Sequence, residues 1–445
     1  MKQHAKGQRP DSAVTEQRAS HDACLWRPKR RQVLVGLAAS VGATPRLRAA
    51  ARTTLTVAAF PLVDEIVRAA LPGFRQRYPE VAVEVISRQY ADHHTAMTTA
   101  LSTSVRLPDV MALEASYVGR FSHGLGLEDL SKPPYGVDQL SNRFVAYAFD
   151  QTLNRRGERI AVPTDIGPGT LLYRHDLLAK AGVSAHELTT SWEAYVSAGQ
   201  RVKAATGAYL IGNAQSVKDI VIRVGLKPGD GLYFDKDSRV LVNSPRFRRA
   251  FELARQVRRH KLDAKVNAWS NEWAEGFRRG TIATDLTGAW MVGQMANWVA
   301  PTTRGLWRVT QLPEETFVGY GGTFYAIPRR ANALSKPLAW ELIRTLTLDP
   351  QLQLAAFKSQ DAFPALTETH QDPFFDEPVA FLGGQRARGL WREAARRITA
   401  TQVHKQSNFA DEVVSTELDN VLENRKDIDR ALADAHRLLE RRALR

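Results

Sequence analysis

The sequence predicts an α/β protein with two lobes. Its 445 residues are too many for one ordinary hydrophobic core, and 44% of them are apolar, as in a globular protein. Near the start, TLTVAA (54–59) and VAVEVI (81–86) are typical of strands, and residues 63–78 between them have the spacing of an amphipathic helix. Because a helix between two strands forms a βαβ unit, we expect a parallel pair with the helix packed on the sheet.

Further elements follow from the same patterns. A second helix is predicted over 92–101, and a third strand over 108–113 that ends at Glu114. Two strand pieces, 160–163 and 170–173, are expected to be joined by an irregular loop rich in Gly and Pro. The other predicted helices span 176–181, 192–206, 215–224, 245–261, 336–346, 350–358, 389–400 and 428–441.

Residues 1–51 are predicted to be an export signal. Arg30 and Arg31 precede an apolar run over 33–43, and alanines 49–51 follow, which is the order of a signal peptide and its cleavage site. The run is shorter than the roughly 20 residues that a membrane-spanning helix needs. The sequence RRQVL from Arg30 onward also resembles the twin-arginine consensus, so we expect export to the periplasm by that route. The alternative is a basic tail on an intracellular protein.

Composition excludes several classes of function. The formal net charge is +14, but the first 51 residues hold ten Lys and Arg against three Asp and Glu, so half of that charge belongs to the signal. The rest is dispersed along helices, so no nucleic-acid partner is expected. The one cysteine, Cys24, lies before the apolar run, which leaves a mature chain without thiol chemistry. We expect no metal, no cofactor and a monomer.

The stretch 281–328 is the most informative. Two segments typical of strands, 281–286 and 323–327, each adjoin a turn with glycine and an aromatic residue, as in GAW (288–290) and GYGG (319–322). Glycine leaves room above the main chain, and flat rings supply rigid contact surface. The pattern favours a ligand surface, although ordinary strand-end turns with core aromatics would also produce it.

Together these segments resemble the extracellular solute-binding proteins of ABC importers, in the sugar-binding, maltose-binding-protein-like branch. The resemblance covers residues 52–445 and rests on the order of LTVAAF, GFRQRYPEVAVEVI, LPDVMALEASYVGRFSHGLGLEDLS, IAVPTDIGPGTLLYRHDLLAKAG, the GAW turn and FVGYGGTFYAIP. It implies a two-lobed periplasmic binding protein fold. Each lobe would be a mixed sheet flanked by helices, and a hinge with several crossings would close both lobes over one ligand.

The resemblance also implies lobe boundaries. The N-terminal lobe would comprise 52–161 plus 320–365, and the C-terminal lobe 163–318 plus 366–445, with crossings near Val162, Gly319 and Ala365.

The expected ligand-binding residues come from the resemblance and from the strand ends, because ligands of open α/β sheets meet the carboxyl ends of the strands. Trp290 corresponds to a tryptophan that stacks on a sugar ring, and Asp165 to an acid that accepts hydrogen bonds from hydroxyl groups. Asp361 stands where relatives often carry a basic or small residue. The full set is Phe60, Glu114, Ser116, Asp165, Asn213, Gln215, Trp290, Tyr320, Gly321, Gly322 and Asp361.

The expected function is the substrate-binding component of an ABC transporter, which captures a sugar or related polyhydroxylated solute between the lobes and delivers it to an inner-membrane permease. Asp361 and the lack of a clear aromatic series leave the ligand class open, so a polyamine or an organic anion on the same fold is the first alternative. A carbohydrate-active enzyme with Glu114 and Asp165 as its carboxylate pair is the second. We expect no enzyme, because the chain has no Gly-x-Ser-x-Gly elbow and the adjacent His93 and His94 lack zinc-pair spacing.

Overall fold

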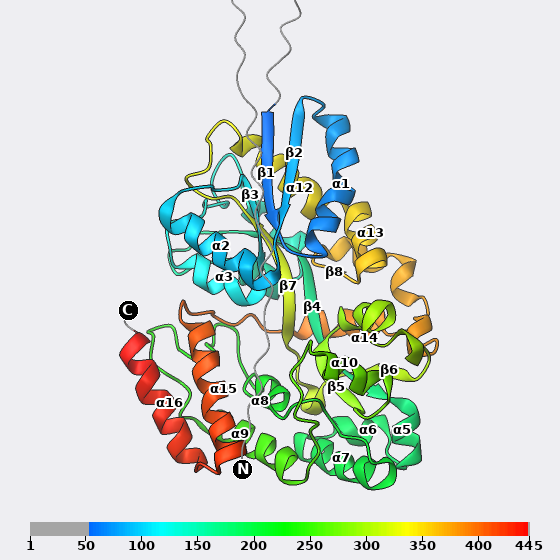
Figure 1. Ribbon diagram of the computed structural model, residues 1–445. Coiled ribbons are helices and arrows are strands. Elements are labelled where there is room, and N and C mark those ends of the chain that lie inside the picture. The colour runs from blue at the N-terminus through cyan, green and yellow to red at the C-terminus, as the bar shows by residue number, and fades with distance from the viewer. Residues whose placement is uncertain (1–52, 444–445) are drawn as a thin grey trace, which may run out of the picture. The chain divides into compact units, whose positions relative to one another are not determined.

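The computed structural model describes residues 53–443, so the predicted export signal over 1–51 lies outside the described residues (Figure 1). Its strands are β1 (Thr53–Ala59), β2 (Val81–Ser87), β3 (Val110–Glu114), β4 (Val162–Arg174), β5 (Thr284–Gly288), β6 (Trp307–Thr310), β7 (Gly319–Ala326) and β8 (Phe363–Pro364). Its α-helices are α1 (Val63–Arg77), α2 (Tyr90–Thr103), α3 (Ala115–Ser122), α4 (Ala146–Asp150), α5 (His175–Lys180), α6 (Ala185–Thr189), α7 (Trp192–Thr206), α8 (Gln215–Val221), α9 (Pro245–Arg259), α10 (Asn271–Arg278), α11 (Met291–Gln294), α12 (Lys336–Leu348), α13 (Pro350–Gln360), α14 (Arg388–Arg397), α15 (Ser407–Asn424) and α16 (Ile428–Ala443). A π-helix, η2 (Met295–Val299), continues α11, and short 3-10 helices include η5 (Thr367–Gln371) and η6 (Pro373–Asp376).

The strands form one mixed sheet in the order β2-β1-β3-β7-β4-β5, and β6 and β8 also pair with β4. β1 is parallel to β2 and to β3, as the predicted βαβ unit requires. β7 is antiparallel to β3 on one side and to β4 on the other. Figure 1 shows β4 and β7 side by side, running from the helices around β1 to the helices around β5.

β4 differs from the prediction of two short pieces and a loop. It is one strand of 13 residues, and its early residues pair with β7 and β8 while its later residues pair with β5 and β6. The Gly- and Pro-rich middle leaves its trace as register shifts against β7 between Pro163 and Asp165 and between Ile166 and Pro168. Pairing on both edges thus outweighs the turn tendency of Gly and Pro, which appears only as bulges.

The helices cover the sheet in two groups. Near the N-terminal strands, α1 packs on β1 and β2 and against α12 and α13, while α3 packs on β3 and β7. Near β5, α9 is surrounded by α7, α8, α15 and α16. The described residues, 53–443, belong to one compact unit, so the lobe boundaries given above stay a prediction.

Several elements were not predicted. The largest omission is α15, a helix of 18 residues whose buried positions, Ala410, Val413, Val414, Leu418 and Val421, do follow helical spacing. The helices α3 and α10 and the strand β6 were also missed. By contrast, the predicted helix 192–206 has the bounds of α7, and the predicted helix 215–224 extends three residues beyond α8.

We expect Phe357→Ala to lower the free energy of unfolding by about 3 to 5 kcal/mol, because it empties a fully buried aromatic position. Phe357 is 1% exposed, and its ring lies 5.1, 5.4 and 5.3 Å from the rings of Phe363, Phe374 and Phe375. It therefore joins α13 to β8 and η6. Urea denaturation measures the change. Leu334→Ala, at a side chain 86% exposed, is the control and should stay within about 0.5 kcal/mol of wild type; equal effects of the two substitutions would contradict the prediction.

Candidate functional site

Predicted site residues gather where β7 runs between β3 and β4. Thr323 of β7 pairs with Glu114 at the end of β3 and with Asp165 of β4. Residues directly opposite each other in antiparallel strands project from the same face of the sheet, so Glu114 and Asp165 flank Thr323 on one face. We call this place the crossing site, and it comprises Glu114, Asp165, Trp290, Tyr320, Gly321 and Gly322.

The indole of Trp290 points back from the end of β5 onto β7. Its Nε1 donates a hydrogen bond to the Tyr320 carbonyl oxygen at 2.8 Å, and the two rings lie 6.4 Å apart. A methyl group built on Gly288 would lie 2.3 Å from Nε1, so glycine gives the indole its room. A methyl group on Gly321 would lie 3.2 Å from Nε1 and 3.9 Å from Glu114 Oε1, which brings the indole and the carboxylate to one point. Trp290 is half-buried.

Two of the three glycines of β7 are needed for this approach. Gly321 and Gly322 have φ angles of 89° and 129°, a region that residues with a side chain rarely adopt. A methyl group on Gly322 would also lie 2.9 Å from the Asp165 carbonyl oxygen. The main chains of β7 and β4 can therefore come this close only with glycine at that position.

The carboxyl group of Asp165 has a raised pKa. Burial raises the pKa of Asp165 to about 6; hydrogen bonding from Thr323 lowers it, and the nearby charge of Glu114 raises it further. The same carboxyl group raises the pKa values of Tyr147 and Tyr325, whose first cause is burial. Among the described residues, neither tyrosine hydroxyl has a hydrogen-bond partner. Two tyrosine hydroxyl groups near Asp165 are thus free to form hydrogen bonds.

A cavity of about 420 Å³ borders Asp165 between α1 and α13. Apolar side chains make most of its wall, and Gln353 and Gln360 supply polar atoms. Ala362 brings the cavity next to Asp361. The crossing site therefore has open space on its α13 side.

The two carboxylate oxygens of Glu114 have different roles: one stabilises the local structure, and the other faces the crossing site. Its Oε2 accepts hydrogen bonds from the Ser116 backbone N–H at 2.9 Å, which caps α3, and from the Tyr90 hydroxyl at 2.8 Å. Phe60 packs edge-to-face on Tyr90 with ring centroids 5.7 Å apart. Phe60 and Ser116 thus connect to the crossing site through Tyr90 and Glu114. The second oxygen of Glu114, Oε1, faces Gly321.

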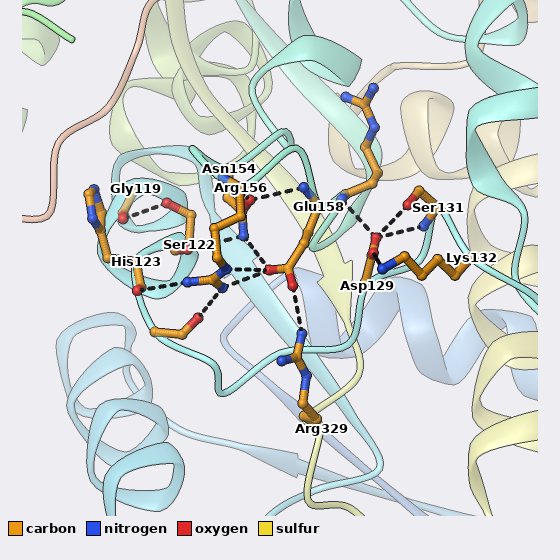
Figure 2. A network of polar contacts seen from close by, with 12 residues as sticks. Gly119, Ser122, His123, Asp129, Ser131, Lys132, Asn154, Arg156, Glu158 and Arg329 are labelled. Atoms are coloured by element: carbon orange, nitrogen blue, oxygen red, sulfur yellow. Dashed lines mark hydrogen bonds and ion pairs between the residues drawn. The ribbon is translucent and has the colours of Figure 1, made fainter.

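A polar network fixes the far end of α3, as Figure 2 shows. Arg156 donates to Glu158 Oε2 and to the Gly124 carbonyl oxygen, the latter at 2.9 Å. Asn154 donates to the same Glu158 oxygen at 2.8 Å, and Arg329 reaches Oε1 at 3.4 Å. The network therefore ties the segment at the C-terminal end of α3 to residues 154–158 and to Arg329.

Asp361 approaches the site from α13. A methyl group built on Gly293, in α11, would lie 1.9 Å from Asp361 Oδ2, so the carboxylate touches the helix that begins after Trp290. Burial raises the pKa of Asp361 to about 6, and the charge of Arg388 lowers it. The structure thus brings Asp361 beside the crossing site.

Asn213 and Gln215 are committed elsewhere. The Gln215 side-chain amide donates to the Ser415 carbonyl oxygen and to Asp419 Oδ1, both at 2.9 Å. The Asn213 side-chain oxygen accepts from the Gln215 backbone N–H at 3.0 Å. Within residues 53–443, no hydrogen bond joins either residue to the crossing site. The sequence analysis could not anticipate these hydrogen bonds because it did not predict α15, whose residues accept them from the Gln215 amide.

The sequence analysis missed three residues near the site. Asp285 of β5 is 8% exposed, and burial raises its pKa to about 7; its carboxylate has no hydrogen bond or ion pair among the described residues. The Trp269 ring lies beside the Trp290 ring, the Trp298 ring lies beside the Trp269 ring, and Trp269 and Trp298 are each about half exposed. The available signal was the concentration of four tryptophans within residues 269–298.

No group of three His, Cys, Asp or Glu side chains within residues 53–443 has an arrangement that could hold a metal ion. His93 and His94 are both buried, with ring planes at 90° to each other. None of the helices in this part of the chain is long and apolar enough to cross a membrane.

A family model described as "Bacterial extracellular solute-binding protein" matches residues 70–382. The chain belongs to this family. The resemblance drawn from the sequence is therefore confirmed, and with it the assignment to binding proteins rather than enzymes.

Curated relatives are distant. The arabinooligosaccharide-binding protein of Bacillus subtilis (strain 168) is 21% identical over 269 residues, which is 58% of this chain and 61% of that protein. An arabinooligosaccharide-binding protein of Halalkalibacterium halodurans is 27% identical over 145 residues, 31% of each chain. The chain thus matches less than two thirds of the length of either relative.

Solved structures agree in fold. The crystal structure of an extracellular solute-binding protein of family 1 superposes with a TM-score of 0.77 at 22% identity, covering 88% of this chain and 100% of the other. The sugar-binding protein MalE of Xanthomonas citri gives a TM-score of 0.73 at 22% identity, covering 88% and 98%. The predicted periplasmic binding protein fold is confirmed.

We expect Asp285→Asn to raise the melting temperature at about pH 8 and to have no effect near pH 4. The folded chain binds the Asp285 proton more tightly than the unfolded chain, since burial raises the pKa from 3.8 to about 7. The contribution of this group to stability is therefore greatest below about pH 4 and falls as the pH rises to about 7. Differential scanning calorimetry across this range measures the difference.

Asp176→Asn is the matched control of opposite sign. Burial raises the pKa of Asp176, but hydrogen bonds and charge from Arg174 outweigh burial and leave the pKa below its ordinary value. The asparagine variant should therefore melt lower than wild type at about pH 8. If the melting temperatures of wild type and Asp285→Asn changed with pH in parallel, the prediction that ionised Asp285 lowers stability would be wrong.

Proposed function

We propose that the protein captures a carbohydrate at the crossing site and delivers it to the permease of an ABC importer. The observation that carries the proposal is the half-buried indole of Trp290, fixed by its hydrogen bond to the Tyr320 carbonyl oxygen beside the carboxylates of Glu114 and Asp165. A sugar presents apolar C–H faces and a rim of hydroxyl groups. Its binder needs flat rings for the faces and acceptors for the rim.

The two proposed acceptors, Glu114 and Asp165, differ in the hydrogen bonds they already accept and in their pKa. Glu114 Oε1 faces Gly321, while its Oε2 already accepts from Tyr90 and Ser116. Each hydrogen bond from a sugar hydroxyl to a charged carboxylate contributes about 1.5 to 3 kcal/mol. Asp165, with its pKa raised to about 6, is largely ionised at neutral pH and adds a second acceptor.

The names of relatives support the choice of ligand class. Two curated relatives are arabinooligosaccharide-binding proteins, and one structural neighbour is a sugar-binding protein. We assign the protein to the periplasm, reached by the predicted twin-arginine signal. Ligand binding would favour the closed arrangement of the two lobes because only that arrangement touches the ligand from both sides, and the permease would read that closure.

A polyamine is the second candidate, and one observation favours it. Asp285 is a buried and Asp361 a partly buried carboxyl group; burial raises the pKa of each, and neither has an ion pair among the described residues. A cationic ligand beside either group would compensate its charge. An organic anion fits this acidic setting poorly.

Mass spectrometry of the ligand that co-purifies with the mature protein tests the proposal directly. A thermal-shift screen of sugars and polyamines provides the second line, because a ligand at 100 times its dissociation constant adds about 2.7 kcal/mol of stability. A shift with a carbohydrate supports the proposal. A shift with polyamines alone would replace it with the second candidate.

We expect Trp290→Ala to abolish the thermal shift produced by the carbohydrate that stabilises wild type most. The substitution removes the ring on which the sugar face would rest. Trp290→Phe keeps a ring but loses the hydrogen bond to Tyr320, so it should keep part of the shift. Titration calorimetry measures both affinities, and circular dichroism checks that both variants fold. An unchanged shift in Trp290→Ala would remove this residue from the site.

A further inference from the structure

We propose that the contact between α3 and the segment before α15 is a pH-sensitive latch, which holds the two groups of helices together at neutral pH and releases them in acid. The latch lies outside the crossing site and comprises Gly119, His123, Arg155, Ser238, Val403 and His404. The first three residues belong to the predicted N-terminal lobe and the last three to the predicted C-terminal lobe. The inference does not depend on which ligand the protein binds.

α3 touches the segment before α15 without space between them. The helices α3 and α15 are also in contact (Figure 1). A methyl group built on Gly119 would lie 2.2 Å from Val403 Cγ1 and 2.8 Å from the Val403 carbonyl oxygen. Because a backbone oxygen cannot rotate away as the end of a flexible side chain can, a larger residue at position 119 would force the two segments apart. Glycine is unfavourable inside a helix, so its place in α3 matches this close approach.

Hydrogen bonds join the same two parts of the chain beside this contact. Arg155, in the loop after α4, donates to Ser238 Oγ at 3.2 Å and to the Asp235 carbonyl oxygen at 3.4 Å. The Nε2 atom of His404 lies 3.2 Å from the same Ser238 Oγ. Ser238 therefore links a residue of the predicted N-terminal lobe to His404.

The hydrogen bonds of His404 select its neutral form. Its Nδ1 accepts from the Gln406 backbone N–H at 3.1 Å, and Gln406 is the N-cap residue of α15. The proton of the neutral ring is therefore on Nε2, which donates to Ser238 Oγ. A second proton would go to Nδ1, where it would face the Gln406 N–H. Protonation of His404 would thus break a hydrogen bond at the start of α15.

The two histidine rings of the latch lie next to each other. Their centroids are 5.5 Å apart, and the Phe234 ring lies 4.3 Å from the His404 ring. His404 is 4% exposed. Figure 2 shows His123 beside Arg156, whose Nη1 donates to the His123 carbonyl oxygen at 3.5 Å. A proton added to either ring would therefore place a charge beside the other ring with little water to solvate it.

The charged side chains on the elements around the two rings include more cations than acids. They are Arg120, Arg155, Arg156, Glu158, Asp235, Asp237, Arg239 and Lys405. Each of the three acids already forms an ion pair with an arginine of this set, and the first turn of α15 contains no acid. Within residues 53–443, neither Arg155 nor Lys405 has an ion pair. The surroundings therefore oppose a positive charge on the histidines.

Burial, followed by the charges of Arg155 and Lys405 among others, lowers the pKa of His123 and of His404 from 6.5 to about 4. If the latch opens, both rings regain water, and each pKa returns toward 6.5. The closed arrangement thus binds these protons less tightly than the open one. The contribution of the pair to closure is fully present above about pH 6.5 and is lost as the pH falls toward 4.

Pulsed electron paramagnetic resonance on the mature protein tests the inference without any ligand. Leu334, just before α12, and Leu438, in α16, are exposed and belong to different groups of helices. Residues 52–445 contain no cysteine, so Leu334→Cys and Leu438→Cys would carry the only two spin labels. We expect the ratio of the closed to the open population to fall about tenfold or more between pH 7.5 and pH 5.

Histidine variants show whether the latch causes this opening. His404→Asn removes the titrating ring, while its side-chain oxygen can still accept from the Gln406 N–H. It should remove most of the pH dependence, and His123→Asn combined with His404→Asn should remove nearly all of it. Other groups with raised pKa values, such as Asp285, titrate in the same range. An unchanged pH dependence in the double variant would assign the opening to them and overturn the latch.

Glycine variants test the close contact. Gly119→Ala should favour the open population at every pH, because the methyl group meets Val403. Gly73→Ala is the matched control: it lies in α1, and its methyl group would have nothing within 4 Å, so the populations should stay as in wild type. Circular dichroism checks that all variants fold. Equal populations in the two alanine variants, or wild-type populations that do not change with pH, would overturn the inference and leave the proposed carbohydrate function untouched.

Discussion

The antiparallel pairing of β4 with β7 is the contact on which the rest of the structure depends. β4 pairs with β7 and β8 through its first residues and with β5 and β6 through its last, so one strand carries the sheet from one group of helices to the other. The bulges beside Pro163 and Pro168 loosen the ladder where a hinge would need to bend. Every residue of the crossing site is on these two strands, at the end of β3, or on the turn after β5 that leans on β7. Movement of the two parts against each other would therefore change the site directly, which is how a ligand could control it.

Around this pairing the protein keeps groups that are unfavourable without a ligand. Asp285 is a buried carboxyl group, and Asp165 and Asp361 are partly buried. Burial raises the pKa of all three, so each lowers stability when it is ionised. Trp269 is held at positive φ. Unfavourable local states persist where surrounding structure enforces them, and they concentrate at functional sites. Under the proposed function, hydroxyl groups of a sugar would donate hydrogen bonds to the Asp165 carboxylate and so compensate part of its burial.

Much of the fold was accessible to sequence reasoning because its signals are local. Alternating apolar residues marked β1 and β2, helical spacing marked α1 and α7, and the order of segments pointed to the family that the comparisons confirm. β4 was predicted wrongly because Gly and Pro in its middle favour a turn, and only the neighbouring strands make that segment extended. α15 was missed although its buried positions have helical spacing.

For the site, the sequence by itself singled out the GAW turn with Trp290 and the GYGG turn with Gly321 and Gly322 as a candidate ligand surface, because glycine next to an aromatic ring is a local signal. The tertiary structure decided what lies around them. It drew the Gln215 amide to α15, set Asp361 against Gly293, and aligned Trp269 and Trp298 with Trp290 from separate segments. The physical reason is range: residue type and spacing constrain the backbone over a turn or two, whereas the direction and neighbours of a side chain are fixed by packing between segments that are distant in the chain.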